Sequence, residues 1–333
     1  MRICIVGAGA IGGFLAVRLA LTGQDVTVIL RGANLDAVRR NGFTLIEENG
    51  SERVVKSIKA TSHIKEVGVQ DVVILGMKAH QVAAVAADLP QLMHGTTRVV
   101  TMQNGIPWWY FYKLAGDHIG MPVRAVDPDG LIAKFIPIDS VIGSVVYPAS
   151  EVIRPGVIKV IEGNRFTLGE IDGSDTPSVR AISDAFKAAG FKAPVSMDIR
   201  SEIWLKVWGN LSFNPISALT HATLEDICMY PPTRELAATM MTEAQAIGEK
   251  LGVQFKVSLE KRIAGAQAVG QHKTSMLQDV EQGRALELQA LVASVIELGQ
   301  ITQTPTPTIQ AVYALASLLA KNLQQHNATL KIS

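Results

Sequence analysis

Cysteine is nearly absent from this sequence: Cys4 and Cys228 are the two present in 333 residues. Two cysteines so far apart form neither a disulfide framework nor a metal-binding pattern, so we expect no oxidising compartment and no metal. Uninterrupted apolar runs of about 18 residues are also absent, which predicts no membrane span. The first apolar strand begins at Arg2 or Ile3, which leaves no room for a signal peptide. These absences predict a cytoplasmic protein.

An excess of charge of one sign is lacking as well. Lysine and arginine number 31 and aspartate and glutamate 30, so the formal net charge is +1, and no dense basic cluster occurs. A nucleic-acid-binding protein is therefore not expected. Apolar residues make up 48% of the chain and charged residues 18%, which is typical of a globular protein. We expect a small-molecule partner, no nucleic acid and no membrane, and either a monomer or a homodimer.

Short apolar runs alternate with helical segments in the first part of the chain. Strands are predicted at Ile3–Val6, Asp25–Leu30, Asp71–Leu75 and Arg98–Met102, because each is a short apolar run of the kind found in buried parallel strands. The segment Ala10–Leu21 fits a helix, and an Ala/Val-rich helical segment separates the third strand from the fourth. This alternation predicts an α/β fold with a Rossmann-type, doubly wound parallel sheet.

The pattern changes after about residue 128. Strand-like pieces separated by Gly and Pro predict an antiparallel extension of the sheet over residues 128–173. A helix at Val179–Ala189 and a last strand or linker at Phe191–Ser196 follow. Strand signals then nearly vanish, so we predict a first domain of residues 1–196 and an all-helical second domain of residues 197–333. Helices are predicted there at Ile199–Leu219, Arg234–Leu251, Leu259–Ala268, Leu286–Gly299 and Thr308–Leu323.

Glycines mark the turn between the first strand and its helix. The stretch GAGAIG at residues 7–12 fits the pattern G-x-G-x-x-G, and the strand, helix and second strand that this motif requires surround it. Gly7 permits the tight turn, Gly9 lets the backbone approach a pyrophosphate, and Gly12 lets the helix lie close to the sheet. The helix N-terminus at Ala10 and Ile11 faces the anion. An alternative is a turn whose glycines serve packing alone, but the surroundings of the motif favour a dinucleotide site.

Arg31 indicates which dinucleotide binds. Sites for NAD usually carry Asp or Glu at the end of the second strand, where the carboxylate accepts hydrogen bonds from the ribose 2′-hydroxyl. This chain has Ile-Leu-Arg-Gly at residues 29–32 instead. An acid would repel a 2′-phosphate, whereas the Arg31 guanidinium pairs with it. The alternative is a solvated surface arginine. Because the acid is missing, we favour NADPH as the cofactor.

A polar stripe crosses an otherwise apolar predicted helix. Lys206, Asn210 and Asn214 are spaced four residues apart within residues 201–219, so they share one helix face. One interpretation places this face in solvent or has the asparagines hold neighbouring backbone. The other has the stripe face a substrate, because polar groups in a buried helix need partners. A desolvated Lys206 would have a lowered pKa, which makes it a better proton donor near neutral pH.

Two further polar residues carry little information alone. Ser275 lies in the stretch His272–Asp279 before a helix and is interpretable as a cap or turn residue, and Glu287 as a surface glutamate. No Ser/His/Asp signature and no H-E-x-x-H or C-x-x-C spacing occurs, so no metal ligand is nominated.

Taken in order, these pieces resemble the ketopantoate reductase (2-dehydropantoate 2-reductase) family over nearly the whole chain. The shared pieces are GAGAIG at 7–12, Arg31, MKAH with Lys78, MQNG with Asn104, K-x-x-x-N-x-x-x-N at 206–214, SMLQD at 275–279 and the helix with Glu287. The resemblance implies an NADP-dependent oxidoreductase acting on CH–OH groups, with a Rossmann domain, a helical domain and an active site in the cleft between them. It also implies a place in pantothenate biosynthesis.

The resemblance implies a role for each matching residue. Lys206 is the catalytic acid, and Glu287 is its acidic partner. Substrate binding is implied for Asn210, Asn214 and Ser275, and proximity to the cofactor for Lys78 and Asn104. Hydride transfer to the carbonyl of a 2-oxo acid places negative charge on the oxygen, which the Lys206 ammonium stabilises and then protonates.

Three departures from the family pattern leave the substrate open. His272 stands where the family often has Asn, Leu224 replaces a usual substrate-contacting Asn, and the loop Trp108–Tyr110 is unusually aromatic. These aromatics fit either packing or a reshaped pocket mouth. The expected substrate is 2-dehydropantoate. The alternatives are a related reductase or dehydrogenase acting on another 2-oxo or 3-hydroxy acid, and an NADP-sensing protein without turnover.

Overall fold

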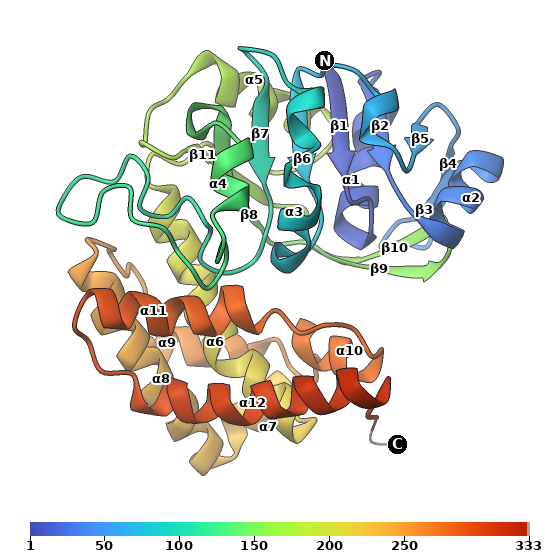
Figure 1. The fold of residues 1–333 in the computed structure, drawn as a ribbon. Coiled ribbons are helices and arrows are strands. Elements are labelled where there is room, and N and C mark those ends of the chain that lie inside the picture. The colour runs from blue at the N-terminus through green and yellow to red at the C-terminus, as the bar shows by residue number, and fades with distance from the viewer. Residues whose placement is uncertain (332–333) are drawn as a thin grey trace. The chain divides into compact units, whose positions relative to one another are not determined.

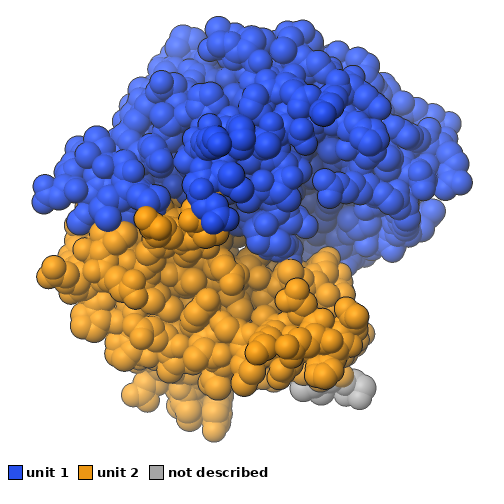
Figure 2. All heavy atoms as spheres, viewed as in Figure 1, with its two compact units in different colours: residues 1–103, 108–122, 129–199 blue, residues 104–107, 123–128, 200–333 orange. Residues whose placement is uncertain are grey.

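The computed structural model describes residues 1–331 and divides into two compact units (Figure 2). Residues 332–333 of the predicted second domain lie outside the described part. Unit 1 consists of residues 1–103, 108–122 and 129–199, and unit 2 of residues 104–107, 123–128 and 200–333. Two short segments of the N-terminal half thus pack with the C-terminal half. The functional division at residue 196 stays a prediction, as does the choice between monomer and homodimer.

Unit 1 contains the predicted Rossmann-type sheet. Its order is β11-β8-β7-β6-β1-β2-β5, and all neighbouring pairs are parallel except β11 with β8 (Figure 1). β11 is therefore antiparallel, as predicted for this part of the chain, whereas β8, predicted in the same extension, pairs in parallel with β7. The strands are β1 (Arg2–Val6), β2 (Asp25–Ile29), β5 (Lys59–Thr61), β6 (Val72–Leu75), β7 (Arg98–Thr101), β8 (Val141–Val146) and β11 (Phe166–Glu170).

A second sheet of four strands corrects one expectation. The pieces predicted to extend the main sheet include β9 (Ala149–Arg154) and β10 (Val157–Glu162), which instead join β3 (Phe43–Ile46) and β4 (Glu52–Val55) in the order β4-β3-β10-β9. β10 pairs in parallel with β3, with Val157 opposite Thr44. Periodicity identified both strands but could not identify their partner, which lies more than a hundred residues earlier in the chain.

Helix α1 (Ala10–Leu21) contacts both sheets of unit 1. It contacts β1 and β2 of the large sheet and β3, β9 and β10 of the small one. Its sequence is apolar on nearly every side, so a single sheet would leave apolar surface exposed to water. A Cβ on Gly13 would lie 2.2 Å from Ile158 Cδ1, which shows how closely the helix and the small sheet approach.

The remaining helices of unit 1 are short connections around the sheet. α5 begins at the N-cap Thr176, whose side chain accepts a hydrogen bond from the Val179 N–H. The predicted strand or linker at 191–196 makes two isolated bridges, at Lys192 and Val195, to residues of the β11 region. The helices are α2 (Gly32–Asn41), α3 (Ala79–Ala86), α4 (Leu131–Phe135) and α5 (Pro177–Ala188), and the 3-10 turns are η1 (Ile64–Glu66), η2 (Leu89–Leu92) and η3 (Ile138–Ser140).

Unit 2 is helical, as predicted. Its long helix α6 packs against α8, where Trp208 Nε1 donates a hydrogen bond to the Met241 carbonyl. The sequence missed the six-residue α7 and the seven-residue α10, which are too short to show a period but carry the N-caps Thr223 and Thr274. The helices are α6 (Ile199–Thr220), α7 (Leu224–Met229), α8 (Pro231–Lys250), α9 (Leu259–Ala268), α10 (Ser275–Glu281), the π-helical turn η4 (Gln289–Ala293), α11 (Ser294–Ile301) and α12 (Pro307–His326). Among the described residues, no helix has both the length and the apolar character that a membrane crossing needs.

Candidate active site

The strand order of the large sheet reverses between β1 and β6. From β1 the chain proceeds through β2 to β5 on one side, and from β6 through β7 to β8 and β11 on the other. Open α/β sheets bind ligands at such a switch point, outside the carboxyl ends of the strands. Gly7 follows β1 and Gly76 follows β6, so the predicted glycine loop stands at this point of the sheet.

Three glycines pack around one carbonyl at the switch point. A Cβ on Gly12 would lie 2.3 Å from the Gly7 carbonyl oxygen, and a Cβ on Gly76 2.6 Å from the same atom. Gly7 has a φ of +92°, and a Cβ there would lie 2.9 Å from Met77. Any larger residue at these positions would force the loop open. Sequence reasoning found Gly7 and Gly12 but missed Gly76, whose signal is a glycine directly after a buried strand.

Gly9 differs from these three glycines because space surrounds it. No heavy atom of the described residues outside its own neighbourhood lies within 4 Å of a Cβ built on Gly9, and the residue is exposed. It is the N-cap of α1 without a side-chain cap, and the N–H groups of Ala10 and Ile11 in the first turn have no partner within the helix. An open cradle at a helix N-terminus fits the pyrophosphate of a dinucleotide.

Arg31 and Lys78 follow the carboxyl ends of two other parallel strands of unit 1. Arg31 is exposed at the N-cap of α2, just after β2, and its side chain makes no hydrogen bond or ion pair to other described residues. Lys78 is half-buried at the N-cap of α3 after β6. Gln103, which follows β7, links the carboxyl ends of β6 and β7. Its Nε2 donates hydrogen bonds to the Leu75 and Met77 carbonyls at 2.8 and 3.0 Å.

Lys206, Asn104 and Glu287 come together in unit 2. Lys206 Nζ donates a hydrogen bond of 2.6 Å to Asn104 Oδ1, although 102 residues separate them. Burial lowers the pKa of Lys206 from 10.5 to about 8, and the negative charge of Glu287 acts in the opposite direction. Glu287 is 9% exposed and stands directly before the helix that begins at Leu288. The Lys206 ammonium thus has a hydrogen-bond partner within unit 2, and the substrate-facing interpretation of the α6 stripe stays a prediction.

The other residues of the predicted substrate set differ in their surroundings. Asn214 is 5% exposed, and its Nδ2 has no hydrogen-bond partner among the described residues. Asn210 is half-buried one turn before it. Ser275 is exposed as the first residue of α10, after Thr274, whose side chain accepts the Leu277 N–H. A buried amide donor without a partner is costly, and a ligand oxygen would satisfy it.

The positions that depart from the family pattern fall into two groups. Leu224 and His272 are adjacent, because the Leu224 N–H donates to the His272 carbonyl at 3.1 Å. Trp108, Trp109 and Tyr110 are each buried, and Trp109 Nε1 donates to Thr101 Oγ1 at 3.0 Å. Burial of all three aromatics supports the packing interpretation of that loop.

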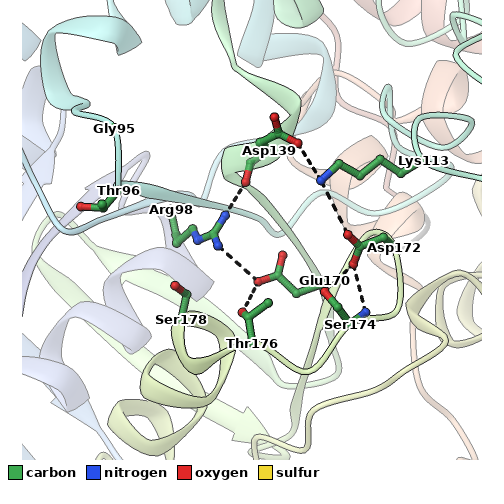
Figure 3. Close-up of a pocket in the computed structure, with 10 residues that line it drawn as sticks. All are labelled: Gly95, Thr96, Arg98, Lys113, Asp139, Glu170, Asp172, Ser174, Thr176 and Ser178. Carbon is green, nitrogen blue, oxygen red and sulfur yellow. Dashed lines mark hydrogen bonds and ion pairs between the residues drawn. The ribbon is translucent and has the colours of Figure 1, made fainter.

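A polar cavity of about 360 Å³ lies elsewhere in unit 1 (Figure 3). Arg98 at the start of β7 and Glu170 at the end of antiparallel β11 line it, so it opens at the edge of the sheet opposite the glycine loop. Its charged groups pair with one another: Arg98 with Glu170 at 3.7 Å, and Lys113 with Asp139 and Asp172 at 2.7 and 3.7 Å. No predicted site residue lines this cavity.

Comparisons with known proteins match both units. The family model described as "Ketopantoate reductase PanE/ApbA" matches residues 3–173, and "Ketopantoate reductase PanE/ApbA C terminal" matches residues 198–320. A 2-dehydropantoate 2-reductase of Mesorhizobium japonicum is 52% identical over 321 residues, which cover 96% of this chain and 98% of the relative.

Solved structures have the same fold. A candidate ketopantoate reductase from Ralstonia solanacearum MolK2 is 41% identical with a TM-score of 0.92, and the match covers 97% of this chain and 98% of the other. A D-mandelate dehydrogenase solved with NADH and anilino(oxo)acetate is 20% identical with a TM-score of 0.82 and coverage of 97% and 100%, which shows a shared fold alone. The resemblance, the fold class and the enzyme class predicted from the sequence are confirmed: the chain belongs to the ketopantoate reductase family of oxidoreductases.

Proposed function

We propose that this chain reduces 2-dehydropantoate to pantoate with NADPH, and that Lys206 is the proton donor. The observation that carries the proposal is the Lys206 ammonium, which is held by Asn104, acted on by the charge of Glu287, and has its pKa lowered to about 8. A general acid is most effective when its pKa lies near the working pH. The name of the Mesorhizobium japonicum relative supports the substrate.

The cofactor assignment rests on residues of unit 1. The open space at Gly9 and the first turn of α1 fit a pyrophosphate, and the unpaired, exposed Arg31 guanidinium among the described residues fits a 2′-phosphate. NADPH, when bound, supplies the hydride that adds to the carbonyl carbon. We include Lys78 among the residues that bind the cofactor, because it follows a neighbouring parallel strand.

Lys206 acts on the carbonyl oxygen of the substrate. As the new C–H bond forms, the electron pair of the C=O bond moves to oxygen, and the ammonium stabilises this charge. Nζ then gives its proton to the oxygen, which yields the hydroxyl of the product and leaves a neutral amine that regains a proton from solvent. Glu287 favours the protonated form of Lys206. Because the donor must be protonated, turnover falls as the pH rises through about 8.

Three side chains of unit 2 are assigned to substrate orientation. Asn210 and Asn214 follow Lys206 along the same face of α6, and Ser275 presents its hydroxyl at the start of α10. The partnerless Nδ2 of Asn214 among the described residues supports a hydrogen bond to a substrate oxygen. Holding the carboxylate and hydroxyl of the substrate in one orientation lowers the entropic part of the barrier.

A different 2-oxo acid is the second candidate substrate. The adjacency of Leu224 and His272 favours it, because both departures from the family pattern change the same place in unit 2. A D-mandelate dehydrogenase shares the fold and supports an aromatic acid as a member of the test panel. A third candidate, an NADP sensor, predicts binding without turnover.

Oxidation of NADPH should be followed with 2-dehydropantoate, a branched 2-oxo acid without the hydroxyl, and phenylglyoxylate. We expect the highest kcat/KM with 2-dehydropantoate. A preference for either other acid would replace the substrate assignment while leaving the chemistry in place. Absence of turnover with all three, together with tight NADPH binding, would favour the sensor. The variant L224N/H272N serves as the comparison, and we expect it to favour 2-dehydropantoate further.

A further inference from the structure

Gly105, Ile106 and Ala290 hold Asn104 near Lys206, although the proposed mechanism gives none of the three a contact with the substrate. Asn104 precedes Gly105 and Ile106, and the Ile106 N–H donates a hydrogen bond of 2.9 Å to the Ala290 carbonyl. This short segment is thus held at both ends: by its first side chain to Lys206 and by its third N–H to Ala290. All of these residues belong to unit 2.

Ala290 belongs to the π-helical turn η4, which begins two residues after Glu287. Bonding from residue i to i+5 widens such a turn and moves its carbonyls out of the regular α-helical alignment. The Ala290 carbonyl accepts from two groups outside the ordinary backbone ladder, the Ile106 N–H and Ser294 Oγ, the latter at 2.6 Å. Single π-turns are rare and often lie at functional sites.

Gly105 makes this contact possible. Its φ is +97°, and a Cβ built on it would lie 2.1 Å from the Ala290 oxygen and 2.4 Å from the Ala290 carbonyl carbon. Those atoms are backbone, so they cannot move aside as a flexible side chain could. Any residue other than glycine would push the segment away from η4 and carry Asn104 with it.

We propose that Gly105 and the π-helical turn form a positioning device, which holds the Asn104 carboxamide against Lys206 and thereby aims the proton-donating ammonium. The inference rests on the proposed function, since it assumes that Lys206 is the acid. Ala290 and Gly105 act through Asn104 and are positioning residues. Asn104, for which the family resemblance implies proximity to the cofactor, gains a role toward the lysine.

The test compares G105A with G116A. Gly116 has a similar φ of +113°, but a Cβ there meets no atom of the described residues within 4 Å, so G116A carries the backbone strain without the collision. We expect G105A to lower kcat about 100-fold, because a displacement of about 1 Å in a catalytic group has effects of that size. G116A should keep the activity of the parent enzyme. Unchanged kcat in folded G105A would overturn the proposal.

The pH profile of kcat separates positioning from a merely structural role. The Asn104 oxygen stabilises the charged form of Lys206, and Glu287 is the charged group whose field also acts on it. N104A should therefore move the alkaline limb down by about one pH unit, whereas N104D, which keeps an oxygen acceptor and adds negative charge, should move it up. Because Gly105 acts through Asn104, G105A should shift the limb in the direction of N104A and add little in the double variant.

S294A keeps the inference testable where G105A does not fold, because it removes one of the two donors to the Ala290 carbonyl without adding atoms. We expect a smaller loss of kcat and a downward shift of the same limb. An unshifted limb in S294A and N104A would contradict the device. K206A separates failure of the proposed function from failure of the positioning inference. If K206A retains turnover, Lys206 is not the acid and the proposed function fails. If K206A loses turnover while N104A and S294A behave like the parent enzyme, the positioning inference fails and the proposed function stands.

Discussion

The glycine loop after β1 and the polar stripe of α6 are built in opposite ways. At the loop, the backbone forms the predicted site, and the side chains of Gly7, Gly12 and Gly76 are missing because atoms would collide there. On α6, side chains form the predicted site, and an apolar helix holds them away from water. A backbone site can be identified from spacing alone, whereas a side-chain site becomes clear only once its partners are known.

Removal of the Lys206 side chain should cause the largest loss of activity among these variants. K206A removes both the proton donor and the charge that stabilises the oxyanion, so we expect kcat to fall about 10²- to 10⁴-fold. Binding of NADPH, measured by fluorescence titration, should change little, because Lys206 is assigned to the carbonyl oxygen of the substrate and not to the cofactor. The exposed Lys250 provides the control variant, K250A. Retention of most activity in K206A would show that Lys206 is not the acid and that the α6 site does not depend on this side chain.

The difference between backbone and side-chain sites also explains which features could be predicted from the sequence. The helices Ala10–Leu21 and Leu259–Ala268 were predicted with the bounds that the structure shows, because glycine or a capping serine marks an end of each. The parallel sheet followed from its buried, β-branched strands. Local patterns decide both features.

Long-range pairing decided the rest. The partner of β10 is β3, and the partner of Lys206 is Asn104, each more than a hundred residues distant. The local sequence pattern around residue 290 does not predict a π-helical turn, nor that its Ala290 carbonyl accepts a hydrogen bond from the Ile106 N–H. The sequence nominated the side chains of the candidate site, whereas the hydrogen bond between Lys206 and Asn104 became visible only in the fold.

Two glycines of the loop should separate folding from binding. A Cβ at Gly12 would collide with the Gly7 carbonyl at 2.3 Å, so G12A should lower the free energy of unfolding by about 1–3 kcal/mol. A Cβ at Gly9 meets no protein atom within 4 Å among the described residues, so G9A should stay within about 1 kcal/mol of the parent and weaken NADPH binding instead.

Gly265 in α9 is the control, because it lies within a helix, as Gly12 does, and a Cβ there meets no atom of the described residues within 4 Å, as at Gly9. G265A should raise the free energy of unfolding by about 0.5–1 kcal/mol, the ordinary helix preference of alanine over glycine. Urea unfolding of the three variants, with NADPH titration beside it, gives both quantities. Equal destabilisation by G9A and G12A would show that the loop serves packing alone.

Substitution of Arg31 should have the smallest of these effects, a modest loss of NADPH affinity. It tests a side chain that we assign to the backbone-built cofactor site beyond the glycine loop. Arg31 is exposed, so salt screens its charge. R31A should weaken NADPH binding about tenfold at low salt and less at high salt, while NADH binding stays unchanged, because NADH lacks the 2′-phosphate. Arg40, exposed on α2, gives the control R40A. An equal loss for both nucleotides would assign Arg31 to the fold of α2, and no loss for either would leave NADPH preference to another residue.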